Sequence, residues 1–187
     1  MLGGVLAGGS SLLAVLDTAR AASAAEPGDF TAEQIAFLDE IAETILPATK
    51  TPGAKAAKVG AFMAFMVTDA YSPAEQKVFL QGMQQVEATM RRANGVSFME
   101  ATPGQRLAML TMVDHDAKRL MDARAAARHG TDTEPPHYFR MMKELVLLGF
   151  FTSEIGCTQA QRFVETPGRF DPCIPYTPGE PAWALHA

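Results

Sequence analysis

Three helix-capping motifs constrain the fold of this chain more than any other feature. Thr31 and Gln34 form a capping box, and Ser72-Pro73-Ala74-Glu75 joins an N-cap serine to a proline and a glutamate of the first turn. Thr102-Pro103-Gly104-Gln105 repeats this pattern. Apolar residues follow each motif at intervals of three and four, whereas no stretch alternates as a β-strand does and no internal repeat is found. The sequence therefore predicts an all-α fold.

We expect a single compact domain of five or six helices, followed by an extended proline-rich C-terminal arm. The predicted parts are a signal-peptide-like segment at 1–24, the helical domain at 25–165 and the arm at 166–187. Helices are predicted at 31–45, closed by Pro47, and after the loop 49–53, where Phe62, Phe65 and Met66 form the apolar side. A third helix is predicted at 73–94, with the apolar stripe Phe79, Met83, Val86 and Met90 and the stop signal Asn94-Gly95, and a fourth at 103–128, with Leu107, Leu110, Val113, Ala117 and Leu120 on its apolar side. The last two predicted helices are 137–151 and a shorter one at 153–164.

Composition and charge exclude some classes of function. The 187 residues are 48% apolar and 20% charged, which is ordinary for a globular protein. The net charge of −5 argues against a nucleic-acid-binding protein, which needs a concentrated basic face. The pairs Arg91/Arg92 and Arg124/Arg128 are isolated, so we interpret them as solvated helix faces.

The first 24 residues have the pattern of an export signal. Leu2 to Leu16 is moderately apolar and rich in glycine, and Ala22-Ser23-Ala24 fits a signal-peptidase cleavage site. This run is too short and too rich in glycine to span a membrane. No basic residue precedes Leu2, so we expect the basic start upstream of Met1, and the mild hydrophobicity favours the twin-arginine route to the periplasm. An N-terminal helix that packs on the rest of the chain is the alternative.

The two cysteines, Cys157 and Cys173, both lie in the C-terminal part of the chain. In an oxidising periplasm they are expected to form one disulfide, and two unpaired thiols are the alternative. The pair has no further cysteine or nearby histidine, so it is not a zinc site.

Motifs of catalysis and cofactor binding are missing from the sequence. It contains no dinucleotide-binding glycine motif, no P-loop, no H-E-x-x-H and no G-x-S-x-G. Asp114-His115-Asp116 is interpreted as a solvated helix face. Glu134-Pro135-Pro136-His137 has the letters of E-x-x-H, but its prolines break a helix and no second copy exists. We therefore expect no catalytic, cofactor-binding or metal-binding residues, and an accessory or binding protein rather than an enzyme.

The segment LVLLGFFTSEIG, residues 145–156, is apolar on every side before it turns polar at Thr152. A helix without a polar face must be covered all round. We expect Met141, Met142, Leu145 and Leu148 to fill the core, which leaves Val146, Phe150 and Phe151 to contact a partner protein. The alternative is a central helix wrapped by the other helices. Ser153 is expected to cap the short helix that follows, with Glu154 in its first turn.

The last 22 residues contain five prolines, with Phe170, Tyr176 and Trp183 spaced between them. Proline limits the entropy that an extended segment loses when it orders on a partner, and aromatic side chains are frequent interface anchors. We interpret the arm as partner-binding, and packing on its own subunit is the alternative.

The stretch HYFRMMKELVLLGFFTSEIGCTQAQRFVETPGRFDPCIPYTPGEPAW resembles the gluconate 2-dehydrogenase subunit 3 family. The opening FTAEQIAFLDEIAETILPATKTPGAKAAKVGAFM is also similar to it, so the resemblance covers about residues 30–184. Cys157 occupies a position where the family has a small residue, so the resemblance does not imply a Cys157–Cys173 disulfide. The matching motif residues are Gly149, Phe150, Phe151, Thr152, Ser153, Glu154, Gly156, Gln159, Pro167, Gly168, Phe170, Cys173 and Pro175.

This resemblance implies a small, non-catalytic subunit of a periplasmic flavoprotein dehydrogenase. The partner it implies is a large subunit of the glucose-methanol-choline oxidoreductase type, which holds FAD and travels with the small subunit through the twin-arginine route. A cytochrome c subunit with haem c often accepts the electrons. Substrates across the family are sugars, sugar acids and glycosides oxidised at the 3-hydroxyl. The chain itself is expected to hold no cofactor.

Two alternatives to the accessory role stay open at this point. The chain could supply residues to the substrate entrance of the large subunit, with His137, Tyr138 and Glu154 as candidates, or it could be an unrelated periplasmic helical binding protein. For the accessory role, the expected interface residues are Tyr138, Val146, Phe150, Phe151, Phe170, Tyr176 and Trp183.

Overall fold

The computed structural model describes residues 30–127, 134–166, 168, 173, 175 and 177–184. These residues form helices and loops without a β-strand, so the predicted all-α fold is confirmed. The elements follow in the order α2 (Ala32–Ile45), α3 (Val59–Ala70), α4 (Pro73–Asn94), α5 (Pro103–Ala127), α6 (Tyr138–Phe151) and the π-helical turn η1 (Gly156–Ala160). The predicted export segment 1–24 lies outside the described residues.

Each predicted capping motif starts a helix. At α2, the Thr31 hydroxyl accepts a hydrogen bond from the Gln34 amide at 3.3 Å, and the Gln34 side chain accepts one from the Thr31 amide at 2.8 Å. Ser72 with Glu75 and Thr102 with Gln105 form the same reciprocal pairs at the starts of α4 and α5. These bonds satisfy amides that have no partner inside the helix, which is why the boundaries were predictable.

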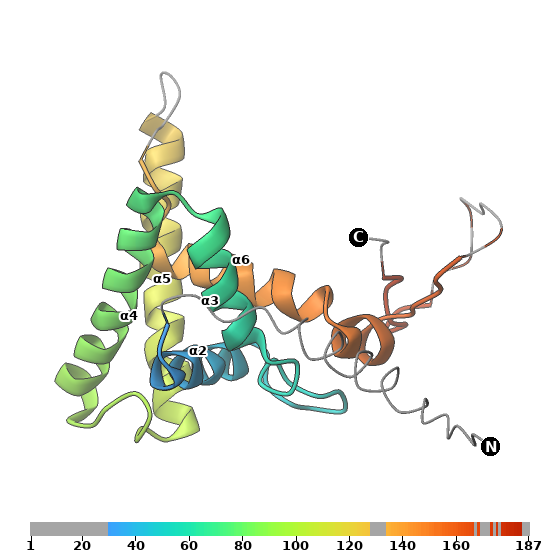
Figure 1. Cartoon of the computed structure of the whole chain (residues 1–187), viewed down its shortest axis with the longest axis horizontal. Helices are drawn as coiled ribbons and strands as arrows, with labels where there is room; N and C mark the ends of the chain where they lie inside the picture. Colours follow the sequence, from blue (N-terminus) through green and yellow to red (C-terminus); the bar gives the residue numbers. More distant parts are fainter. Residues whose placement is uncertain are drawn as a thin grey trace, which may run out of the picture.

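α6 is the central helix of the fold, because it contacts α2, α3, α4 and α5. In Figure 1 it starts beside α5, runs across the bundle behind α3 and extends to the right. The interpretation of α6 as a central helix wrapped by the others is therefore confirmed for its inner side. That side contributes Phe139, Met142 and Val146 to a core that also contains Phe79 and Phe98.

Two glycines let α6 lie close to its neighbours. A Cβ atom on Gly82 of α4 would lie 2.4 Å from the Cβ of Tyr138, at the start of α6. A Cβ atom on Gly149 would lie 2.5 Å from the ring of Phe62, in the first turn of α3. Both approaches are shorter than van der Waals contact, so the crossing of α6 with α4 and α3 needs a residue without a side chain at each point.

The structure corrects several details of the predicted helices. The buried side of α3 is formed by Met63, Ala64 and Val67, whereas Phe62, Phe65 and Met66 are half-buried. Leu107 and Leu120 of α5 are exposed. The helix predicted at 153–164 ends at Ala160. α3 is apolar on nearly all sides, so its periodicity did not reveal which side faces the core.

Candidate functional site

The last two turns of α6 carry an exposed apolar face, which we name the α6 terminus. Leu147, Leu148 and Phe151 form it, and they are 39%, 47% and 40% exposed. Residues at i, i+1 and i+4 share one side of a helix, so these three side chains adjoin. The same side is polar one turn earlier, where Arg140 and Glu144 form an ion pair at 2.8 Å. The apolar exposure is thus confined to the end of the helix.

The α6 terminus differs from the predicted partner interface. Val146 and Phe150 are buried in the core of this chain, as is Tyr138, so none of them is free for a partner. Leu148, predicted to be in the core, is exposed instead. Of the α6 residues predicted to contact a partner, Phe151 alone is exposed. The close contacts at Gly82 and Gly149 fix the rotation of α6, and a residue pattern without a polar side could not reveal it.

The residues after α6 form its C-terminal cap. The Thr152 hydroxyl donates to the Leu148 carbonyl at 2.7 Å, and the Ser153 hydroxyl donates to the Phe150 carbonyl at 2.7 Å. The Ser153 hydroxyl also accepts from the Gly156 amide at 3.0 Å, which confirms the predicted N-cap of the next turn. The Thr-Ser-Glu-x-Gly motif therefore satisfies carbonyls that the helix end would leave without partners.

His137 occupies the opposite end of α6 as its N-cap. Its Nδ1 accepts from the Phe139 amide at 3.2 Å, and its ring lies 4.3 Å from that of Tyr138. Burial lowers the pKa of His137, and the nearby Arg124 guanidinium lowers it further. Arg124 donates to the Pro135 carbonyl at 2.8 Å and so holds the segment before α6 against α5.

The three residues considered for a substrate entrance are not brought together. His137 and Tyr138 lie at the first turn of α6, and Glu154 is exposed beyond its last turn. A helix of this length, 14 residues, separates its ends by about 20 Å. One small-molecule site formed by all three is therefore excluded by the geometry of the chain.

His137 is expected to make the stability of this protein depend on pH. Its pKa is lower in the folded chain than in the unfolded chain, so the unfolded chain takes up the proton first as the pH falls. The stabilisation is complete above the unfolded pKa of about 6.5 and is lost as the pH falls through the folded pKa. Thermal unfolding followed by circular dichroism should show a falling midpoint below about pH 6.5.

The matched variant for this prediction is His137→Asn. Asparagine keeps a side-chain acceptor at the N-cap but does not titrate, so it should remove the part of the pH dependence that His137 causes. Equal pH dependence of the wild type and the variant between about pH 5.5 and 7.5 would contradict the role assigned to His137.

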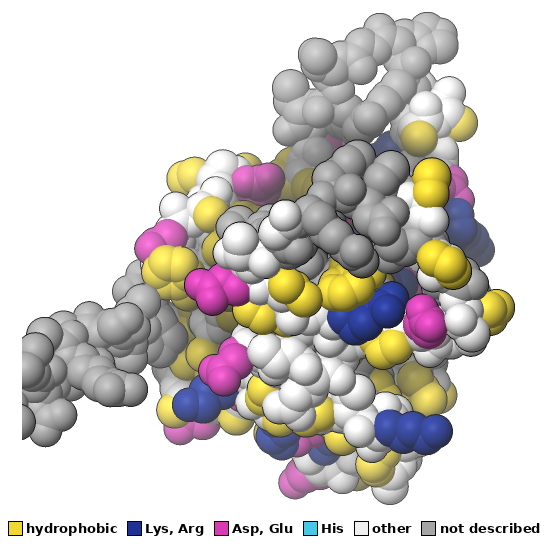
Figure 2. All heavy atoms as spheres, turned by 90° about the vertical axis from the view of Figure 1, so that its right-hand side faces the viewer, with side chains coloured by type: hydrophobic (Ala, Val, Ile, Leu, Met, Phe, Trp, Pro, Cys, Tyr) yellow, Lys and Arg dark blue, Asp and Glu magenta, His cyan; other side chains and the backbone are white. Residues whose placement is uncertain are grey.

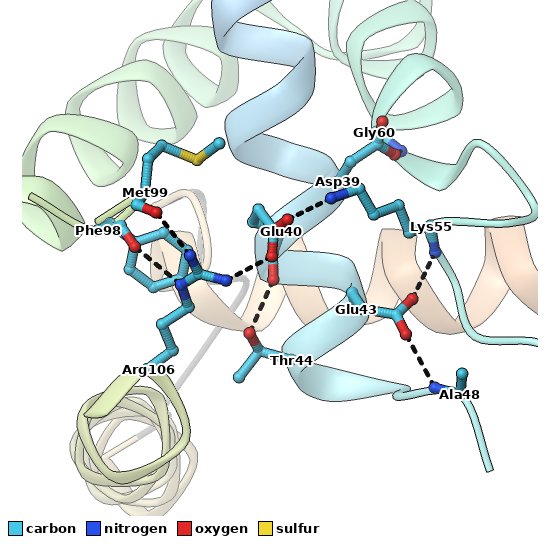
Figure 3. A network of polar contacts seen from close by, with 10 residues as sticks. All are labelled: Asp39, Glu40, Glu43, Thr44, Ala48, Lys55, Gly60, Phe98, Met99 and Arg106. Carbon is cyan, nitrogen blue, oxygen red and sulfur yellow. Dashed lines mark hydrogen bonds and ion pairs between the residues drawn. The ribbon is translucent and has the colours of Figure 1, made fainter. Parts of the chain in front are cut away.

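A second surface feature is the loop Leu46–Lys58 between α2 and α3, which we name the braced loop. The Glu43 carboxylate accepts from the amides of Ala48 and Lys55 at 2.8 and 2.9 Å, as Figure 3 shows. Asp39 accepts from the Gly60 amide at 2.7 Å, just past the loop. Burial raises the pKa of Asp39, and the bond from Gly60 opposes that effect. Carboxylates of α2 therefore fix both ends of the loop.

Glu40 extends this network to the other side of α2. The Arg106 guanidinium donates to Glu40 at 2.5 Å and to the carbonyls of Phe98 and Met99 at 2.8 and 2.7 Å (Figure 3). Lys55 forms an ion pair with the same carboxylate. The side chains of Arg106 and Glu40 are only 13% and 17% exposed, so this is a mostly buried ion pair with its donors satisfied. It joins α2 to α5 and to the turn before α5.

The predicted disulfide is not formed in this structure. Cys157 and Cys173 are both free cysteines, as the alternative prediction had it. The Cys157 thiol donates to the Phe151 carbonyl at 3.3 Å, so it is directed back onto the end of α6, and Cys173 is exposed.

The C-terminal arm pairs with Arg162, just after the turn η1. The Arg162 amide donates to the Ala182 carbonyl at 2.8 Å, and the Ala184 amide donates to the Arg162 carbonyl at 2.9 Å. The Arg162 guanidinium lies 4.5 Å from the centre of the Trp183 ring, which is otherwise largely exposed. Phe170 and Tyr176, the other predicted aromatic anchors, lie outside the described residues.

Acidic side chains and histidines are spread over the described part of the chain. No group of three His, Cys, Asp or Glu side chains there could hold a metal ion. Asp116 pairs with Arg119 on the solvated face of α5, as expected. Asp114 is half-buried and pairs with Lys143 of α6 at 2.7 Å, so it joins the two helices instead. The described helices include none that is long and apolar enough to cross a membrane.

The fold and these surfaces define a small all-α protein with an apolar face exposed at the end of its central helix. Residues 32–168 match the family described as gluconate 2-dehydrogenase subunit 3, and this chain belongs to that family. The match covers α2 to α6 and the turn η1. The family is one of subunits of a dehydrogenase complex. No curated protein and no solved structure matches the chain.

Proposed function

We propose that this chain is the accessory subunit of a periplasmic FAD-dependent dehydrogenase complex, which binds and stabilises the large flavoprotein subunit and accompanies it during export. Family membership supports the place in a dehydrogenase complex. The export pattern of residues 1–24 supports the periplasm. FAD belongs to the large subunit in this proposal, and haem c to a further cytochrome subunit. The substrate class is a sugar, a sugar acid or a glycoside.

The observation that carries the binding role is the α6 terminus. Leu147, Leu148 and Phe151 adjoin on one side of a helix whose other side is buried, so a partner can cover them together without moving the core. Completing the burial of a half-exposed large apolar side chain contributes about 1 kcal/mol or more. Three such contacts supply a useful part of the affinity of a stable interface.

The first test is the variant Leu148→Asp, whose binding to the large flavoprotein subunit of the complex is compared with that of the wild type. An aspartate at this position must lose its hydration in the complex, so we expect at least about 30-fold weaker binding. The free chain should keep its unfolding midpoint, because Leu148 is about half exposed. Binding is measured by calorimetry on the purified subunits.

Leu120→Asp is the matched control, since Leu120 is an exposed leucine on α5, away from the α6 terminus. It should bind as the wild type does. Wild-type affinity of Leu148→Asp would remove the α6 terminus from the interface. A wild-type chain that is monodisperse alone and binds no flavoprotein would contradict the accessory role itself.

A further inference from the structure

The end of the C-terminal arm, residues 177–184, is fastened to the chain by Arg162, and we name it the strap. The Arg162 amide donates to the Ala182 carbonyl at 2.8 Å, and the Ala184 amide donates to the Arg162 carbonyl at 2.9 Å. These two bonds form an isolated parallel β-bridge between Arg162 and Trp183. An isolated pair of strands is only marginally stable in water even when it is longer, so these bonds alone hold the strap weakly.

The side chain of Arg162 adds two further contacts to the strap. Its guanidinium lies 4.5 Å from the centre of the Trp183 ring, and its Nη2 atom lies 3.5 Å from the Glu180 carboxylate. Among the described residues, every hydrogen bond, ion pair and ring contact that joins the strap to the rest of the chain is made by Arg162. The backbone and the side chain of one residue therefore act together as the latch.

The strap has no residue in the core. All its residues are half-buried or exposed, and Trp183 is 46% exposed. In Figure 1 the strap lies on the right-hand side, beyond the end of α6. Figure 2 views the molecule from this side and shows hydrophobic side chains among scattered charged ones. A segment with few buried apolar contacts and exposed backbone bonds opens at a low free energy, without unfolding of the rest of the chain.

The closed latch also contains an unfavourable feature. The Arg162 Nε atom is buried and has no hydrogen-bond partner among the described residues. A buried donor without an acceptor loses the hydrogen bond that water gives it in the open state, and this loss destabilises the closed state. The favourable side-chain contacts are weak, since the side chains of Arg162 and Glu180 are each 36% exposed. The closed and open states are therefore close in free energy.

We propose that the strap is a reversible conformational switch. Arg162 latches it onto the segment after η1, and it opens and closes as one unit while the helices stay folded. Opening exposes the amide, the carbonyl and the guanidinium of Arg162 together, so the strap controls access to these groups. The latch and the strap belong to the same chain, so the opening can be measured on this chain alone and does not depend on the proposed function.

Trp183 reports directly on the latch, because it is the one tryptophan of the chain. The experiment compares acrylamide quenching of its fluorescence in the wild-type chain, in the variant Arg162→Ala and in a synthetic peptide of residues 177–187, which represents the open strap. We expect the wild type to be quenched less than the peptide, and Arg162→Ala nearly as strongly as the peptide. Chymotrypsin cleavage after Trp183 should become about tenfold faster in Arg162→Ala, since cleavage follows the population of the open state. The unfolding midpoint should stay as in the wild type, because the strap has no residue in the core.

Arg91→Ala is the matched control, because Arg91 is also an ion-paired arginine but lies on α4. It should give wild-type quenching and cleavage. Arg162→Lys keeps the positive charge but not the flat guanidinium beside the indole ring, so its strap should be open more often than that of the wild type. Wild-type quenching and cleavage of Arg162→Ala, or quenching of the wild type equal to that of the peptide, would overturn the inference. A clearly lower unfolding midpoint of Arg162→Ala would also overturn it, because the strap would then stabilise the helices and not open separately.

Discussion

Replacing Gly156 with alanine is expected to lower the free energy of unfolding by at least about 3 kcal/mol. A Cβ atom at this position would lie 1.8 Å from the Phe150 carbonyl oxygen and 2.7 Å from its carbonyl carbon. Both are backbone atoms, so no side-chain rotation can relieve the overlap. The turn after α6 must open instead, and the bond from the Gly156 amide to Ser153 would be lost.

Gly104→Ala is the matched control for this prediction. Gly104 lies in the first turn of α5, and a Cβ atom there meets nothing within 4 Å. Alanine in a helix restricts the unfolded chain, so this variant should be more stable than the wild type by about 0.5–1 kcal/mol. Urea unfolding of the three proteins gives both values. Gly156→Ala with wild-type stability would mean that the turn after α6 is not fixed as described.

Replacing Arg106 with alanine is expected to lower the free energy of unfolding by about 2–4 kcal/mol. Arg106 donates to Glu40 and to the carbonyls of Phe98 and Met99, and its side chain is mostly buried. Its removal leaves a mostly buried carboxylate that Lys55 compensates only in part, and two carbonyls without their donor. Chemical unfolding measured by fluorescence or circular dichroism gives the change.

Arg119→Ala separates this effect from the loss of any surface ion pair. Arg119 pairs with Asp116 three residues away on α5, and both side chains are largely exposed. Such pairs contribute little, so this variant should stay within about 0.5 kcal/mol of the wild type. If both arginine variants lose the same stability, Arg106 does not have the structural role that its burial indicates.

The helix starts were predictable because their chemistry is local. Thr31, Ser72 and Thr102 each bind a residue three positions ahead, and those pairs are visible in the sequence as they are in the structure. The buried stripe of α4 was also predictable, since its polar residues occupy the other side of the helix. The all-α fold and the order of the helices follow from such short-range signals.

The candidate site was only partly predictable, because it depends on contacts between distant residues. The motif around Phe151 identified the end of α6, but a helix without a polar side does not show which of its residues is exposed. The loop at 49–53 was predicted, but the contacts that brace it were not. Its brace from Glu43 to Lys55 spans 12 positions, and the bond from Arg106 to Glu40 spans 66.

By itself, the sequence determined the helices and their caps, because these depend on residue types only a few positions apart. It also determined the family resemblance, because that depends on a contiguous motif. Tertiary structure alone decided which side of α6 is buried. Tyr138 packs on Gly82 and Phe62 packs on Gly149, and these two contacts fix the rotation of the helix. That rotation leaves Leu148 and Phe151 exposed.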